Sequence, residues 1–391
     1  MSILDIKAFK VLNSRSDPTI GVQVKTEKGK AWAAAPSGAS VGKAEAKAYP
    51  HGIDAAIAHI NSKADKLKKI DIEEFKDLKK IESEINISKS GANATIALEY
   101  AFLKGLALEK QEPIWRVINP KAKKMPKLLS NVVGGGSHAA GGLDIQEILV
   151  YSNSKTFADG AFLNAEIHKK IKLKLEKKDS YFIGGKTDEG AWTTYLSDLE
   201  ALRLVRDVID HEKTKMYMGI DLAASQLYKN EQYIWKNYAY KSRKKSFTQQ
   251  EHIDLVKDVI KRFKLKYVED PVYEDDFKGF AELNKLDTDV CGDDLTATNV
   301  ERIRRAIRTK SISAIIIKPN QVGSVVKTID AINLAKRAGL KIAFSHRSGS
   351  TEDATLVHIA KAFEADFVKI GISGGERTVK INELIRIEQG L

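Results

Sequence analysis

Short apolar runs in the second half of the chain each end in a polar or charged residue, and these endings could act together. Three of them carry the carboxylates Asp221, Glu269 and Asp293, and later ones carry the amines Lys318 and Lys369. Carboxylate oxygens suit a hard divalent cation, and a lysine facing them can act as a base. The residue types therefore predict a metal site opposite a base and an anion clamp.

The spacing of these endings predicts the element that positions them. After the first interval they recur about every 23 to 28 residues between 217 and 371, with helix-like segments in the gaps. This period is typical of a βα unit, and in a parallel barrel the chemistry sits at the carboxyl ends of the strands. An open doubly wound sheet is the alternative, but acids at successive strand ends converge better in a closed ring. We therefore predict an α/β barrel.

The gaps carry apolar residues three and four apart, as amphipathic helices do. Two capping boxes are predicted, at Thr248 with Glu251 and at Thr298 with Glu301, and Gly339 is expected just past a helix end. The predicted helices are Phe247–Phe263, Asp276–Leu286, Val300–Lys310, Val322–Ala338 and Thr351–Phe363.

We predict two domains, an α+β capping domain over residues 1–125 and the barrel over residues 126–391. Prolines and polar residues between 119 and 126 interrupt the periodic pattern and mark the linker. The expected elements of the first domain are strands Ile3–Leu12, Ile20–Thr26 and Ala31–Ala35 and helices Lys43–Lys63, Ile72–Ile85 and Ala92–Glu109.

The formal net charge of +12 allows two interpretations. Lysines cluster at 169–178 and 236–245, which would suit a polyanion such as nucleic acid. Because no nucleic-acid motif accompanies them, we favour a solvated helix face and a basic surface loop, and we do not expect a nucleic-acid partner.

Other features narrow the class of protein. The single cysteine, Cys291, excludes an intrachain disulfide framework and is expected in the core. The lone thiol is typical of a reducing compartment, and we expect a cytoplasmic protein. No apolar run is long enough for a bilayer, and the start lacks a secretory apolar segment. Gly184–Thr187 is similar to the tail of a P-loop, but Ser180 stands where that motif needs glycine.

A series of motifs closely resembles the enolase family over essentially the whole chain. The series runs Ser14-Arg15, Pro36–Gly42, Gly135–Ala139, Gln146-Glu147, Asp188–Gly190, Gly219–Ser225, Glu269–Pro271, Asp293–Thr296, Lys318–Gln321, Ser345–Gly349 and Leu384–Glu388. The resemblance implies an enolase-type barrel with a capping domain and the reversible dehydration of 2-phosphoglycerate, a phosphorylated hydroxy acid, to phosphoenolpyruvate. It also implies a homodimer or an assembly of dimers.

The resemblance also implies roles at matching positions. Asp221, Glu269 and Asp293 match the ligands of a first Mg²⁺, and Ser40 matches a ligand of a second Mg²⁺ that arrives with substrate. Lys318 matches the general base, and we expect nearby cations to disfavour its protonated form. The remaining matches are Lys369 at the substrate carboxylate, Glu189 as the acid with Glu147 beside it, Arg347 and Ser348 at the phosphate, and His138 and His346 around the substrate.

Some positions depart from the usual family pattern. The segment around Glu189, Lys186–Ala191, differs, as do Ser16-Asp17, Gly134 and the stretch after Lys369. Two other functions therefore stay open. One is a different lyase of the same superfamily acting on a carboxylate substrate, and the other is a non-catalytic polyanion-binding protein with the same fold.

Overall fold

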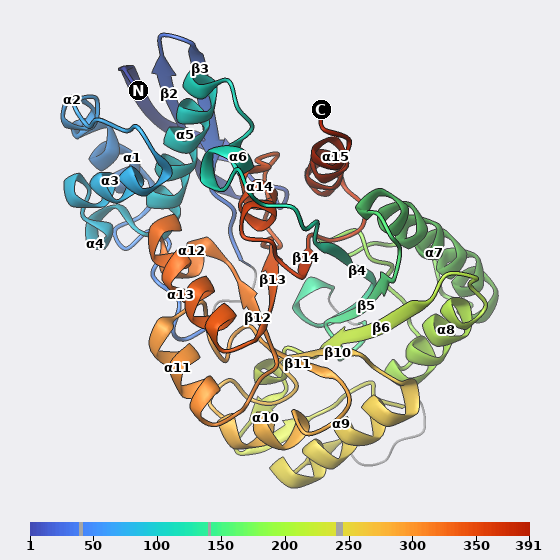
Figure 1. The fold of residues 1–391 in the computed structure, drawn as a ribbon. Coiled ribbons are helices and arrows are strands. Elements are labelled where there is room, and N and C mark those ends of the chain that lie inside the picture. The colour runs from blue at the N-terminus through green and yellow to red at the C-terminus, as the bar shows by residue number, and fades with distance from the viewer. Residues whose placement is uncertain (39–41, 140–141, 240–244) are drawn as a thin grey trace.

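The computed structural model describes residues 1–38, 42–139, 142–239 and 245–391. The chain begins with a three-stranded antiparallel sheet of β1 (Ile3–Leu12), β2 (Pro18–Thr26) and β3 (Gly29–Ala34), in that order. This sheet and the helices that follow it lie to one side of the barrel, at the upper left of Figure 1. The predicted strands of this region are confirmed; the bounds of the first are the same, and those of the other two differ by at most two residues.

The helices of the first region are shorter than predicted, with one exception. The expected helix Lys43–Lys63 is wrong over its first half, because Pro50 and Gly52, which has a φ of 86°, precede the helix that does form. The long apolar helix is confirmed as α5, which is buried on most sides and packs on β2, β3 and α12. The helices are α1 (Ile53–Ser62), α2 (Ala64–Leu67), α3 (Lys79–Glu84), α4 (Ile87–Ser90), α5 (Ala92–Lys110) and α6 (Ile114–Ile118), with a 3₁₀ turn at Phe75–Leu78.

Eight strands close into a barrel, as Figure 1 shows. The predicted strand runs all contribute, and the order around the ring is β10-β11-β12-β13-β14-β4-β5-β6. The strands are β4 (Lys127–Gly134), β5 (Glu147–Ser152), β6 (Met216–Asp221), β10 (Tyr267–Glu269), β11 (Asp289–Gly292), β12 (Ala314–Ile317), β13 (Lys341–Ser345) and β14 (Phe367–Lys369).

Strand β5 runs antiparallel to both of its neighbours, β4 and β6. Its first residue, Glu147, therefore pairs with the last residue of β6, Asp221. A residue that begins an antiparallel strand lies at the same barrel end as residues that finish parallel strands. The antiparallel direction brings Glu147 to the end of the barrel where the acids and lysines of the other strands lie.

Helices cover the outside of the barrel, and α15 at the C-terminus packs beside α7 and α14 (Figure 1). The capping box of Thr248 and Glu251 is confirmed, and Gly339 follows its helix with a φ of 72° as expected. The helices are α7 (Phe157–Lys178), α8 (Asp198–Asp210), α9 (Gln249–Phe263), α10 (Phe277–Leu283), α11 (Val300–Arg308), α12 (Pro319–Val322), α13 (Val325–Arg337), α14 (Thr355–Ala362) and α15 (Gly375–Gln389). A small sheet of β7 (Tyr228–Lys229), β8 (Gln232–Ile234) and β9 (Ser246–Phe247) precedes α9.

The predicted capping box at Thr298 is wrong, because Asn299 is the residue that caps α11. The Asn299 side chain accepts hydrogen bonds from the backbone N–H groups of Glu301 and Arg302. The Thr298 hydroxyl instead accepts from the Lys318 backbone N–H at 3.0 Å and donates to the Gln321 side chain at 2.7 Å. Thr298 therefore helps to position the end of β12 rather than the start of a helix.

Replacing Asn299 by alanine is expected to lower the free energy of unfolding by about 1 kcal/mol, because two backbone donors of α11 lose their acceptor. Chemical denaturation measures this change. Asn299→Asp is the matched control, since aspartate caps about as well as asparagine. Equal losses in both variants would contradict the capping role.

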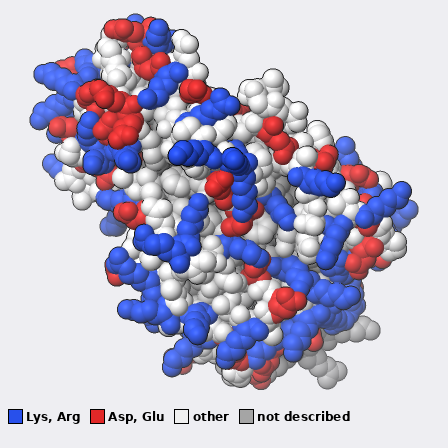
Figure 2. All heavy atoms as spheres, viewed as in Figure 1, with Lys and Arg blue, Asp and Glu red and all other residues white. Residues whose placement is uncertain are grey.

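On the face that Figure 2 draws, charges of both signs are spread among the described residues. Figure 2 shows Lys and Arg interspersed with Asp and Glu on the face drawn there. On α7 the clustered lysines form ion pairs, Lys170 with Glu166 and Glu212 and Lys174 with Asp207. These contacts fit the solvated helix face. The second predicted cluster lies partly outside the described residues.

Two further expectations concern the core and the membrane. Cys291 is fully buried within β11, as predicted for a core thiol. Among the helices of the described ranges, none combines the length and the apolar character needed to cross a bilayer.

Candidate active site

A small buried cavity lies at the barrel end where the parallel strands finish; we call it the mouth cavity. The side chains that line it come from far apart in the sequence and are brought together by the closed ring. Its lining residues are Gly38, His138, Gln146, Glu147, Glu189, Asp221, Asp293, Lys318, Ser345, His346, Arg347, Ser348 and Lys369. Glu269 is completely buried beside it.

The Lys369 ammonium lies among three carboxylates. Its Nζ atom is 2.8 Å from Asp221 Oδ2, 2.8 Å from Glu269 Oε1 and 3.1 Å from Glu147 Oε2. Adjacent strands explain this arrangement, since Asp221 and Glu269 are paired across β6 and β10. Burial, together with Asp221, raises the pKa of Glu269 to about 8. The carboxylates therefore hold more negative charge than the buried site favours.

Lys318 follows β12 and donates a hydrogen bond to Asp293, which follows β11. The predicted effect of nearby cations on Lys318 is present, but the net effect of the site on its pKa has the opposite direction. Burial lowers its pKa, and so do the cations Arg347 and Lys369. The acids Asp293 and Glu269 together outweigh these effects, and the pKa is raised. The prediction considered only the cations and omitted the direct acid partner.

Glu189, Glu147 and His138 form a second polar group in the same cavity. One donor atom from each lies within 4.8 Å of the others. Burial and the neighbouring Glu189 raise the pKa of Glu147 well above its usual range. Burial also opposes ionisation of Glu189, but the imidazoles of His346 and His138 hold its pKa well below the usual value. The two acids therefore prefer opposite protonation states.

The Arg347 guanidinium faces the region that precedes the first helix. It pairs with Glu45 through Nη1 at 2.9 Å and Nη2 at 3.2 Å, and Nη1 also donates to Asn320 Oδ1 at 3.2 Å. Arg347 and Ser348 are each 5% exposed, so an anion bound to them would be largely shielded from water. The contact with Glu45 shows that the guanidinium fork can donate two hydrogen bonds to a carboxylate at this position.

The residues present fit a hard divalent cation. Asp221, Glu269 and Asp293 offer only oxygen ligands, and burial together with acid neighbours raises the pKa of Glu269. Among the residues that the structure describes, two groups have donor atoms within 4.8 Å of one another, His138 with Glu147 and Glu189, and Asp270 with Asp293 and Asp294. Asp293 is the one member that belongs to the predicted metal-ligand set. The Lys369 ammonium lies between the Asp221 and Glu269 carboxylates and donates a hydrogen bond to each.

Asp270 in the second group has a structural partner. Its two carboxylate oxygens accept from the backbone N–H groups of Asp293 at 3.0 Å and Asp294 at 2.7 Å. These bonds hold the turn after β11 and so orient Asp293. These hydrogen bonds explain why Asp270 lies close to Asp293 and Asp294, and no bound ligand is needed to explain it.

Sequence reasoning assigned no role to several amides that orient the acids. Gln321 donates to Asp293 Oδ1 at 3.0 Å, Gln146 donates to Asp221 Oδ2 at 3.3 Å, and Asn131 donates to Glu189 Oε2 at 3.3 Å. Two of them lie inside quoted motifs, Gln146 beside Glu147 and Gln321 three residues after Lys318. Their position close to a predicted site residue was the available signal.

The predicted site residue Ser40 lies outside the described residues. Gly38, the last described residue before it, lines the mouth cavity. The part of the Pro36–Gly42 segment that the structure describes therefore reaches the site.

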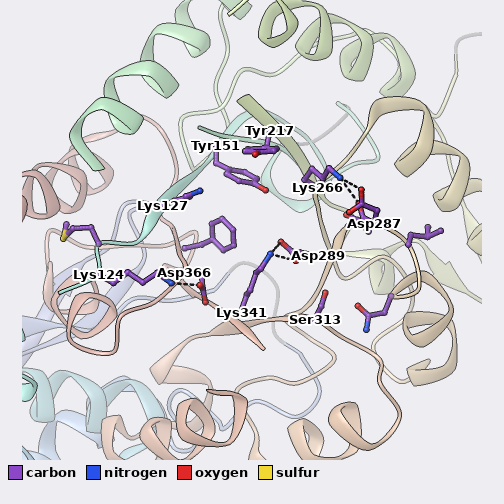
Figure 3. A pocket seen from close by; sticks show the side chains of 15 residues that line it. Lys124, Lys127, Tyr151, Tyr217, Lys266, Asp287, Asp289, Ser313, Lys341 and Asp366 are labelled. Atoms are coloured by element: carbon purple, nitrogen blue, oxygen red, sulfur yellow. Dashed lines mark hydrogen bonds and ion pairs between the residues drawn. The ribbon is translucent and has the colours of Figure 1, made fainter. Parts of the chain in front are cut away.

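A second cavity, with a volume of about 710 Å³, lies at the opposite end of the barrel. Figure 3 shows its lysines turned toward neighbouring acids, Lys341 toward Asp289, Lys266 toward Asp287 and Lys124 toward Asp366. The parallel strands begin at this end, whereas the chemistry of such a barrel sits at the carboxyl ends of its strands, so this cavity does not have the position of an active site.

Comparisons with known proteins agree with the geometry. A family model described as "Enolase, C-terminal TIM barrel domain" matches residues 122–391, and one described as "Enolase, N-terminal domain" matches residues 3–118. A protein named "Enolase" from Thermoplasma acidophilum is 38% identical, over 100% of this chain and 99% of its own. Proteins of the same name from Methanothermobacter thermautotrophicus and Archaeoglobus fulgidus are each 38% identical, over 99% and 100% of this chain and 96% and 98% of theirs.

Proposed function

The chain belongs to the enolase family of enzymes, and on this premise we propose that it catalyses the reversible Mg²⁺-dependent dehydration of 2-phosphoglycerate to phosphoenolpyruvate. The observation that carries the proposal is the mouth cavity, where Lys318 and Lys369 face Asp293 and Asp221 beside Arg347. In this reaction C2 loses a proton and C3 loses its hydroxyl group, so that a C=C bond and one water are formed.

Asp221, Glu269 and Asp293 would hold the first Mg²⁺ with their carboxylate oxygens, and Ser40 would serve a second one. When bound, the metal supplies positive charge that stabilises the substrate carboxylate as a second negative charge develops on it. Enolase-superfamily sites with a base and one or two Mg²⁺ ions are a known example of this pairing.

Lys318 would accept the C2 proton on its Nζ atom. It must be uncharged at that moment, and the contact with Asp293 in this structure favours its charged form. Whether Lys318 can act as the base therefore depends on how the negative charge of Asp293 is balanced. Lys369 would remain charged and hold the substrate carboxylate, which fits an ammonium placed among Asp221, Glu269 and Glu147.

Glu189 and Glu147 would deliver the proton with which the C3 hydroxyl leaves as water. Glu147 favours its protonated form and Glu189 its ionised form, so the pair holds one proton beside the reacting groups. His138 lies 3.8 Å from Glu147 through its Nδ1 atom. His346 donates to Glu189 and thereby orients it.

Arg347 and Ser348 would bind the phosphate. Replacing Arg347 by lysine is expected to lower kcat/KM for 2-phosphoglycerate by about 10- to 100-fold, because an ammonium cannot make two parallel hydrogen bonds to phosphate. Steady-state kinetics measures this change. The control is Arg386→Lys, which alters an exposed arginine of α15. An unchanged kcat/KM in Arg347→Lys would contradict the phosphate role.

The proposed function is tested by offering the purified protein 2-phosphoglycerate and, separately, glycerate, each with Mg²⁺. We expect phosphoenolpyruvate from the first and no dehydration of the second. Dehydration of an unphosphorylated hydroxy acid without turnover of 2-phosphoglycerate would instead identify another lyase of the superfamily. A polyanion-binding function gains no support from Lys170 and Lys174 of α7, which pair with acids.

We also propose that the protein acts in the cytoplasm, that it forms a homodimer or an assembly of dimers, and that its two domains meet between residues 125 and 126. Sedimentation of the purified protein tests the second, and limited proteolysis tests the third.

A further inference from the structure

Arg377 is a completely buried arginine in the first turn of α15 that none of the proposed steps uses. Its two terminal nitrogens each make two hydrogen bonds. Nη1 donates to His346 Nδ1 at 2.7 Å and to the Arg347 carbonyl at 3.0 Å. Nη2 donates to the Ser348 carbonyl at 2.6 Å and to the Asp188 carbonyl at 3.0 Å. One side chain therefore joins the loop after β13 to the loop that carries Glu189.

The bond from Arg377 determines which nitrogen of His346 carries the proton. A guanidinium has donors only and stays charged, so His346 Nδ1 must accept and can hold no hydrogen. A neutral imidazole with a bare Nδ1 has its proton on Nε2. His346 Nε2 lies 2.8 Å from Glu189 Oε1, so it donates to that carboxylate. Arg377, His346 and Glu189 thus form a directed chain of hydrogen bonds.

The other oxygen of Glu189 is also held. Asn131 donates to Oε2 at 3.3 Å, and Glu189 is 3% exposed. Both oxygens of the carboxylate therefore have a donor, and its orientation in the mouth cavity follows from its partners.

The backbone around Arg377 packs tightly against its side chain and helps to hold the guanidinium in place. Gly371 has a φ of 78°, and a Cβ there would lie 2.8 Å from the Glu189 carbonyl oxygen and 3.2 Å from Arg377 Cδ. One turn farther along α15, Lys380 donates to Ser350 Oγ at 3.0 Å and to the Thr351 carbonyl at 2.7 Å. The same helix therefore fixes the loop after β13 at two points.

We propose that Arg377 is a positioning residue, which locks His346 in the neutral tautomer with the proton on Nε2 and thereby holds Glu189 in its reactive orientation. The expected effect on kcat rests on the proposed function. The tautomer of His346 does not, because it is a property of the substrate-free protein. An arginine that only ties α15 to the barrel would require the hydrogen bonds to the backbone carbonyls but not the one to His346.

The test begins with a long-range ¹H–¹⁵N spectrum of the histidines in the wild-type protein at pH 7, with His346→Gln to assign the signal. We expect a neutral His346 with hydrogen on Nε2 alone. A proton on Nδ1, or a charged His346, would overturn the inference whatever the variants do. This arm needs no substrate, so it still decides the inference if the wild-type protein fails to convert 2-phosphoglycerate and the proposed function falls.

Two variants and a matched control complete the test. Arg377→Met removes all four hydrogen bonds, and Arg377→Lys keeps the charge but loses the fork. We expect that in Arg377→Met the proton of His346 is no longer confined to Nε2. We expect both variants to lower kcat by about 100-fold, as misplaced catalytic groups do. Arg386→Met, an exposed arginine of the same helix, should keep the wild-type spectrum and kcat. A folded Arg377→Met with the wild-type tautomer or the wild-type kcat would overturn the inference.

Discussion

Replacing Lys318 by alanine is expected to lower kcat by about 10²- to 10⁴-fold, the range that a positioned general base contributes. Lys318 lines the mouth cavity and contacts Asp293. The other lysine that lines this cavity, Lys369, is held by Asp221 and would have to leave that acid to replace Lys318. Because the phosphate would still meet Arg347 and Ser348, we expect a smaller change in KM than in kcat. Formation of phosphoenolpyruvate over time, at saturating 2-phosphoglycerate, measures the loss.

Two controls make the Lys318 result interpretable. Lys285→Ala removes an exposed lysine and should leave kcat unchanged. Thermal unfolding followed by circular dichroism should show that Lys318→Ala is folded, since Asp293 keeps the Gln321 side chain as a donor. A folded Lys318→Ala variant with the wild-type kcat would remove the base from the proposed mechanism.

Replacing Glu269 by glutamine is expected to weaken Mg²⁺ binding by about 100-fold or more, because the affinity of an oxygen site depends on the number of its charged ligands. The change keeps the volume of a completely buried side chain and can keep the bond from the Tyr267 hydroxyl, which is 2.8 Å from Glu269 Oε2. The variant therefore tests charge with little loss of packing. Calorimetric titration with Mg²⁺ measures the affinity directly.

The same substitution at a surface acid provides the comparison. Glu282→Gln changes an acid that pairs with Lys257 on the outside of the barrel, and its Mg²⁺ affinity should equal that of the wild-type protein. If Glu269→Gln binds Mg²⁺ as tightly as Glu282→Gln does, Glu269 is not a ligand. The rate at saturating Mg²⁺ should still be reduced in Glu269→Gln, since Lys369 loses one of its acid partners.

The barrel and its mouth could be predicted from the sequence because the signal is periodic. A parallel strand that ends in a functional residue recurs with its helix at a regular interval, and this pattern survives without knowledge of contacts. Glu147 shows where the pattern stops being informative. Its strand runs antiparallel, and a run of apolar residues does not reveal the direction of a strand. The family resemblance, rather than periodicity, placed Glu147 in the site.

Contacts between distant parts of the chain account for what the sequence did not reveal. Glu45 pairs with Arg347, which follows it by 302 residues, and Arg377 reaches both His346 and the loop of Glu189. The pKa of Lys318 depends on which neighbour lies nearest, and residue types alone do not decide that. The cap of α11 was misplaced by a single residue because Thr298 and Asn299 are both suitable caps.

The most direct measurement follows 2-phosphoglycerate by NMR in deuterated buffer with Mg²⁺, comparing wild-type protein, wild-type protein with a chelator, and Lys318→Ala. We expect the wild-type protein to replace the C2 proton by deuterium and to form phosphoenolpyruvate, and we expect neither change with the chelator or in the variant. Exchange and product formation at wild-type rates after chelation, or without Lys318, would contradict a lysine base that works beside a metal-binding cluster of acids.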